Sequence, residues 1–138
     1  MKMRSNLTLL LLLLALLGGS LQAATMDYKV KALGLEVVSL RISKEPKSLS
    51  IFVKSLIQNK IFPYVDNSYR INYDANYFPS TTERKVINKK TNCNYYTRYN
   101  YAAGSAQMTT SDKQNQRYSI NRHTRELFSL IMMFCDGK

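Results

Sequence analysis

Hydrophobic and polar residues alternate along much of this chain, most clearly between residues 65 and 102. In residues 69–73 tyrosine and isoleucine alternate with arginine and asparagine, and residues 95–101 repeat the pattern with tyrosine and threonine at every second position. A period of two predicts strands with one buried and one solvated face. Tyrosine suits such strands because its ring packs on the pleated surface while its hydroxyl reaches water or a partner.

The same alternation predicts further strands on both sides of this block. Pro46 lies in a turn between two of them, and Pro79 marks an edge or a bulge. The segment 49–57 is the most apolar, and its length alone would also fit a short helix. We expect strands at residues 27–34, 35–43, 49–57, 79–87, 93–102 and 106–110, and a last short strand or linker around residues 118–120.

Near the C-terminus the period changes to that of a helix, which we expect over residues 124–134. Asn121 or Thr124 is the expected N-cap, and Glu126 suits the positive end of the helix dipole. Four residues recur on the face expected to pack inward: Leu127, Leu130, Ile131 and Phe134. The other face is also apolar, with Phe128, Met132 and Met133, so we expect this helix to be covered on more than one side.

These elements predict a mainly β fold. We expect a curved antiparallel sheet or half-barrel of about six to eight strands, with one C-terminal helix packed on it.

The first 23 residues have the pattern of a secretory signal peptide. Lys2 and Arg4 precede an apolar run over residues 7–17, which is short for a membrane span. We expect cleavage after Ala23; the alternative is an uncleaved N-terminal anchor. The mature chain is then a single β-rich exported domain, residues 24–138, periplasmic or secreted and not transmembrane after cleavage.

The chain is strongly basic, with a formal net charge of +11, two units of which leave with Lys2 and Arg4. Such a charge favours anionic lipid head groups, acidic polysaccharide or nucleic acid as partners. The cations are scattered and form no recognisable nucleic-acid module, so we expect no nucleic acid and assign most of them to solvated strand faces and turns. Tyrosines interleaved with Arg70 and Arg98 fit stacking on sugars or bases, or simple cross-strand packing.

Four motifs follow the export signal in order: Tyr28-x-Val30-x-x-Leu33-Gly34-x-x-Val37, Phe62-x-Tyr64-x-Asp66-x-x-Tyr69, Asp74-x-x-Tyr77-Phe78-Pro79 and Leu127-x-Ser129-Leu130. Together they resemble the exported bacterial family known as domain of unknown function 3108, of which this chain would be a shortened member. The resemblance implies a periplasmic, antiparallel β-rich protein and lends no catalytic residue. The acid that the family has just before its helix and the strands that follow it are not evident here.

The two cysteines, Cys93 and Cys135, leave two interpretations open. In an oxidising compartment they could form a disulfide, closing a loop that stabilises the fold by about 4 kcal/mol. Otherwise they are two buried thiols. Neither belongs to a C-x-x-C motif, which argues against a thiol oxidoreductase.

Nothing in the sequence predicts an enzyme. His123 is the only histidine, and without a G-x-S-x-G motif we interpret it as a surface or cap residue. The carboxylates Asp66, Asp74 and Glu83 are explained by turns and strand ends rather than by a catalytic pair. We therefore expect no catalytic residue, no metal site and no cofactor.

We hypothesise a non-enzymatic periplasmic protein of the cell envelope that binds a hydrophobic or lipid-like ligand between sheet and helix. The ligand-binding residues expected for this function are Phe52, Tyr69, Tyr73, Tyr99, Leu127 and Ile131. The alternative is a structural or assembly protein that docks another envelope protein, or a second copy of itself, through its apolar helix and a sheet edge. An enzyme acting on cell-wall sugar is a distant third hypothesis.

Overall fold

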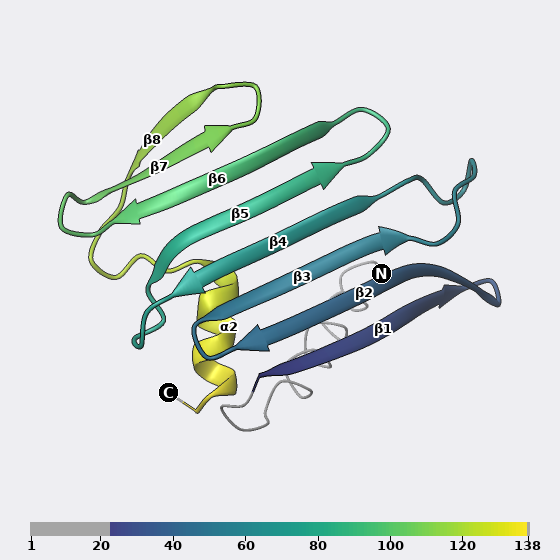
Figure 1. Cartoon of the computed structure of the whole chain (residues 1–138), viewed down its shortest axis with the longest axis horizontal. Coiled ribbons are helices and arrows are strands. Elements are labelled where there is room, and N and C mark those ends of the chain that lie inside the picture. The colour runs from purple at the N-terminus through teal and green to yellow at the C-terminus, as the bar shows by residue number, and fades with distance from the viewer. Residues whose placement is uncertain (1–22, 138) are drawn as a thin grey trace, which may run out of the picture.

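The computed structural model describes residues 23–137 of the chain (Figure 1). The signal peptide assigned to residues 1–23 lies, except for its last residue, outside the described residues. The elements are β1 (Ala24–Ala32), β2 (Leu35–Glu45), β3 (Ser48–Ser55), β4 (Asp66–Tyr73), β5 (Pro79–Ile87), β6 (Asn92–Asn100), β7 (Ser105–Thr110), β8 (Asn115–Ser119) and α2 (Leu127–Cys135).

All eight strands belong to one open sheet in which each strand pairs antiparallel with the next one along the chain. The mainly β fold with one C-terminal helix on an antiparallel sheet is therefore confirmed. The ambiguous segment 49–57 is a strand, since Ser48–Ser55 forms β3. Pro79 begins β5 opposite a register shift in β4, as expected for proline at a bulge.

The core lies on one face of the sheet, where α2 packs across β2, β3 and β4. Ile42, Leu49 and Ile71 are each at most 1% exposed, and they meet Ile131 and Met132 of the helix. Burying each such side chain contributes roughly 1.5–3 kcal/mol, so this cluster is the main reason that the helix stays on the sheet.

The helix begins three residues later than the pattern predicts, at Leu127. Its N-cap is Glu126, whose carboxylate accepts hydrogen bonds from the backbone N–H groups of Phe128 and Ser129. The expected caps were wrong because Asn121 and Thr124 form a separate turn, in which the Thr124 N–H donates to the Asn121 carbonyl at 3.1 Å. An acid therefore does lie immediately before the helix.

The inward face of the helix also differs from the expected one. Leu127 and Phe134 are 61% and 66% exposed, whereas Met132 is fully buried. Ser129, also fully buried, donates its hydroxyl to the Glu126 carbonyl, and its small side chain lets the helix approach the sheet. The helix thus has an outer side that carries exposed apolar residues. Within residues 23–137 no helix is long and apolar enough to cross a membrane.

Candidate functional site

The face of the sheet opposite α2 is polar and basic, and we call it the open face. Side chains alternate between the two faces along each strand. Because Ile42, Ile51 and Tyr69 belong to the core side, their neighbours along the strands point to the open face. By register, seven strands each place one cation there: Lys29, Arg41, Lys54, Arg70, Lys85, Arg98 and Arg117.

These cations are neutralised unevenly. At the β1–β2 side, Arg41 pairs with Asp27 at 2.7 Å and Lys29 pairs with Glu36 at 2.7 Å. The hydrogen bond from Lys29 lowers the pKa of the Glu36 carboxyl. From β4 to β8 the open-face cations form no ion pair with any residue in the described range 23–137. The positive potential is therefore concentrated over the second half of the sheet.

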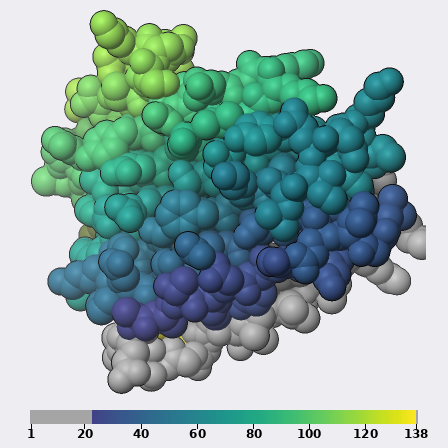
Figure 2. Space-filling model, turned by 45° about the vertical axis from the view of Figure 1, so that its right-hand side comes forward, coloured from purple at the N-terminus to yellow at the C-terminus, as the bar shows by residue number. Residues whose placement is uncertain are grey.

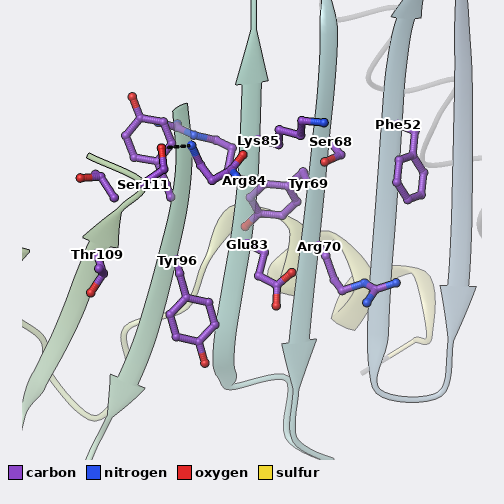
Figure 3. Close-up of a pocket in the computed structure, with 13 residues that line it drawn as sticks. Phe52, Ser68, Tyr69, Arg70, Glu83, Arg84, Lys85, Tyr96, Thr109 and Ser111 are labelled. Atoms are coloured by element: carbon purple, nitrogen blue, oxygen red, sulfur yellow. Dashed lines mark hydrogen bonds between the residues drawn. The ribbon is translucent and has the colours of Figure 1, made fainter. Parts of the chain in front are cut away.

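A hollow of about 520 Å³ lies in this half and crosses β3 to β7 (Figure 3). A single cross-strand row runs through it, in which Arg70 faces Glu83, Glu83 faces Tyr96 and Tyr96 faces Thr109. Arg70 does not turn to Glu83; its Nε donates to the Ser50 hydroxyl at 3.1 Å. Other open-face side chains complete the rim of the hollow: Phe52, Ser68, Lys85, Asn94 and Ser111.

A second hollow, of about 440 Å³, lies beside the first. Its central row joins Arg98 to Gln107 and Gln107 to Arg117. Arg98 is two residues from Tyr96, so this row runs roughly 7 Å from the first one. The two hollows share the open face and are lined by charged, polar and aromatic side chains, and we call them together the open-face groove.

The six residues predicted to bind a ligand do not line one cavity. Tyr69, Tyr73 and Ile131 lie in or against the core beneath the helix. Tyr99 is on the same face of β6 as Thr97. Thr97 is two strands away from Ile71, the β4 residue that the helix covers, so Tyr99 lies beside the helix-covered core rather than in it. Phe52 is on the open face, where it and Tyr69 both line the hollow that crosses β3 to β7, whereas Leu127 is on the outer side of the helix, away from the other five.

The tyrosines under the helix are held in a low-polarity environment. Burial, with the nearby charge of Glu126 and a hydrogen bond to it, raises the pKa of Tyr69 well above its ordinary value. Burial also raises the pKa of Tyr73 to about 12, and its hydroxyl has no hydrogen-bond partner among the described residues. These groups fill the space between sheet and helix.

The structure holds the two cysteines apart and shows no disulfide between them. The Ser111 hydroxyl donates to the Cys93 thiol on β6, whereas Cys135 ends α2 beside Lys44 of β2. Four strand spacings separate β2 from β6, about 19 Å, while a disulfide needs Cα atoms within roughly 7 Å.

No arrangement for catalysis is evident among the described residues. His123 is exposed in the loop before α2, as a surface residue should be. Asp74 accepts hydrogen bonds from the N–H groups of Asn76 and Phe78 in the β4–β5 turn, far along the sheet from Asp66. Within residues 23–137 no three metal-ligating side chains lie together.

No protein family, curated protein or solved structure matches this chain. The resemblance to domain of unknown function 3108 therefore remains an interpretation of the sequence motifs. The open-face groove is a feature that sequence reasoning largely missed. The available signal was the interleaving of tyrosine with Arg70 and Arg98, but nothing in it placed Lys85 and Arg117 on the same face.

Proposed function

We propose that this protein is a non-enzymatic binding protein that acts outside the cytoplasm and holds an anionic saccharide in its open-face groove. The observation that supports this best is the row of Arg70, Glu83, Tyr96 and Thr109, which lies in a hollow of about 520 Å³ among cations without ion-pair partners in the described chain.

The spacing of the cations fits a ligand with several separate negative charges. Arg70 and Lys85 lie on adjacent strands two register positions apart, so their Cα atoms are about 8 Å from each other. Arg98 and Arg117 face the same residue of β7 from both sides, about 10 Å apart. An acidic sugar chain carries carboxylates at comparable intervals, one or two sugar units apart.

The uncharged side chains of the groove fit the rest of a sugar. The ring of Tyr96 can stack on the C–H face of a pyranose, as aromatic side chains stack on flat ligands. The amide and hydroxyl groups of Asn94, Gln107 and Thr109 provide donors and acceptors for sugar hydroxyls. The Glu83 carboxylate can accept hydrogen bonds from sugar hydroxyls. Its negative charge disfavours anionic ligands that have no hydroxyl group to donate.

The hydrophobic ligand expected from the sequence would have to enter the core beneath α2. That space is filled by Ile42, Leu49, Ile71 and Met132, so such a ligand needs the helix to move. The docking alternative is favoured by one observation, the exposed Leu127 and Phe134 on the outer side of the helix. Both alternatives predict ligands that do not contact the open face.

The proposal is tested by titrating the protein with oligogalacturonate and, as a neutral control, with maltohexaose. We expect the protein to bind the acidic oligomer with an affinity that falls steeply as salt is added, because salt screens each contact between a cation and a carboxylate. Tyr96→Ala should weaken binding about tenfold or more, since stacking on an aromatic ring contributes roughly 1–3 kcal/mol.

Tyr118→Ala is the matched control, because Tyr118 is an exposed tyrosine on the opposite face of β8. An equal effect of the two substitutions, or equal affinity for the neutral oligomer, would contradict the proposal. Amide shifts in nuclear magnetic resonance spectra that appear around Leu49 and Ile131 with decanoate would favour the hydrophobic ligand instead.

A further inference from the structure

One end of the sheet combines exposed apolar side chains with lysines. This end carries the β1–β2, β3–β4 and β5–β6 connections, and we call it the loop end; in Figure 1 it is on the right. Five of the large hydrophobic residues exposed in the described chain lie there: Val30, Leu33, Leu35, Leu56 and Ile61. The concentration of apolar surface at one end requires an explanation, because single exposed residues are normally scattered.

Leu33 is placed at the tip of the β1–β2 hairpin against its own backbone preference. Its φ is 53° and that of Gly34 is 78°, which makes a two-residue turn that favours asparagine or glycine at the first position. A leucine is strained in this region of backbone space. At 82% exposure it gains no packing within the chain in return, so folding gives no reason for a leucine here.

Ile61 is displayed by a rigid loop rather than by a loose one. The Asn59 side-chain oxygen accepts hydrogen bonds from the N–H groups of Ile61 and Phe62, both at 2.8 Å, and the Asn59 N–H donates to the Phe62 carbonyl. The Ile61 side chain is nevertheless 71% exposed. Figure 2 shows the β3–β4 loop standing out from the body of the molecule.

The two tips are fixed in relation to each other at their bases. The Leu56 N–H donates to the Val37 carbonyl at 3.0 Å, which ties the start of the β3–β4 loop to β2. The Ser55 hydroxyl donates to the Pro63 carbonyl and accepts from the Val65 N–H, which closes the loop. The apolar tips are therefore held in place before any partner arrives.

Lysines lie at the same end of the sheet as these tips. Lys60 is next to Ile61, and Lys89 and Lys90 form the β5–β6 turn, which is held by hydrogen bonds from the Lys90 and Thr91 N–H groups to the Asn88 side chain. None of these three lysines forms an ion pair within residues 23–137. The Glu36 carboxylate pairs with Lys29 at 2.7 Å and with Lys31 at 4.0 Å. The loop end thus carries more positive than negative charge.

We propose that the loop end docks on the surface of a membrane that contains anionic lipids. Leu33 and Ile61 enter the boundary between head groups and acyl chains, and Lys60, Lys89 and Lys90 contact the lipid phosphates. Separate apolar tips ringed by cations suit a soft, anionic interface better than the flat, continuous patch that a protein partner needs. Neither signal is sufficient alone, since stable surface binding requires both apolar insertion and charge. This inference is independent of the saccharide proposal.

The chain has no tryptophan, so a single introduced tryptophan reports its own surroundings. Ile61→Trp is titrated with vesicles of phosphatidylcholine and phosphatidylglycerol, and we expect its emission to shift to the blue. Phe134→Trp, at a similarly exposed apolar position on α2, is the control and should not shift. Both reporters sit in the same full chain, so other segments contribute equally to both titrations.

Replacing Lys60, Lys89 and Lys90 by serine in the Ile61→Trp protein should raise the lipid concentration at the midpoint at least about tenfold, since each lysine near an anionic surface adds to binding. An Ile61→Trp emission that stays unshifted at saturating lipid would overturn the proposal, as would an equal shift of Phe134→Trp. An equal response to pure phosphatidylcholine vesicles would overturn the role of the lysines.

Discussion

Lys44 of β2 forms an ion pair with Asp136, a residue 92 positions later in the chain, where the side chains are only 5% and 12% exposed. The Tyr77 hydroxyl donates to the other carboxylate oxygen of Asp136 at 2.5 Å. The end of α2 is thus joined to β2 and to the β4–β5 turn through one buried carboxylate. Charged groups out of water depend strongly on their partners, so this contact should add to the attachment that the apolar cluster provides, and losing one partner should be costly.

Lys44→Ala should lower the free energy of unfolding by about 3–5 kcal/mol, because it leaves the Asp136 carboxylate buried without its cation. Urea denaturation followed by circular dichroism measures the change. Lys47→Ala is the control, since Lys47 is exposed in the turn between β2 and β3 and should change stability little. Similar losses in both variants would show that the ion pair does not hold the helix.

Two neighbouring tyrosines should respond in opposite ways to loss of the hydroxyl. Tyr77→Phe removes a hydrogen bond to a charged group and should lower the free energy of unfolding by about 1.5–3 kcal/mol. Tyr73→Phe removes a buried hydroxyl that has no partner among the described residues, so it should be neutral or stabilising. The rings are stacked 5.4 Å apart, so packing is the same in both tests. Equal losses of unfolding free energy in the two variants would refute this prediction.

The N-cap of α2 should make stability depend on pH. Burial raises the pKa of the Glu126 carboxyl above its ordinary value of 4.5, although hydrogen bonds from Tyr69 and the backbone N–H groups oppose the shift. Between the ordinary and the raised pKa the folded protein binds more protons than the unfolded chain. The contribution of Glu126 to stability is therefore largest below pH 4.5 and falls as the pH rises through this window.

Glu126→Gln isolates this contribution, because glutamine keeps an oxygen acceptor for the Phe128 N–H but cannot ionise. The free energy of unfolding of the variant, minus that of the natural protein, should increase as the pH is raised from about 4.5 toward neutrality. Thermal or urea melts at a series of pH values measure the difference. A flat difference, or one that decreases with pH, would mean that the carboxyl is not held in its protonated form by folding.

Substitutions in the open-face groove should spare the fold. Lys85→Ala removes an exposed side chain and should change the free energy of unfolding by less than about 0.5 kcal/mol. Tyr96→Ala removes a half-buried ring from β6 and should cost about 1 kcal/mol. Tyr69→Ala, on the other face of the same sheet, should cost about 3–5 kcal/mol because its ring packs on Phe128 at 4.8 Å. Chemical denaturation of the three variants tests this contrast, and a large loss at Tyr96 would show a structural role for that ring.

Most of the strands were predictable because the alternation that marks a strand is visible in residues close together in the sequence. The alternation around Ile71 or Tyr99 marks two faces, and turn residues such as Pro46 mark where the chain reverses. Which face is buried was not predictable from one strand. In β3, Ile51 and Val53 point to the helix side and Phe52 to the other, although phenylalanine is the largest apolar residue of the three. The choice depends on α2, which lies at the far end of the sequence.

The helix itself shows a second limit. Because apolar residues occur on nearly every side of this segment, their spacing predicted a helix but not which side faces the sheet. Ser129, a polar residue, lies fully buried at the contact with the sheet. The groove was beyond prediction for a related reason. Arg70, Lys85 and Arg98 each resemble an ordinary solvated strand residue, and only the strand register brings them to one surface.

The strand order has a consequence for how the chain acquires its fold. Each strand pairs with the one just before it, so a chain that emerges N-terminus first can add strands one at a time, with low separation between contacting residues. Contacts with α2 are the exception, because Lys44 and the core residues Ile42, Leu49 and Ile71 meet partners that follow all eight strands in the sequence. Until then the growing sheet keeps a lysine on its future core face, and water must solvate it. Docking of α2 therefore closes the apolar face, and from then on the sheet no longer exposes the surface by which it could aggregate.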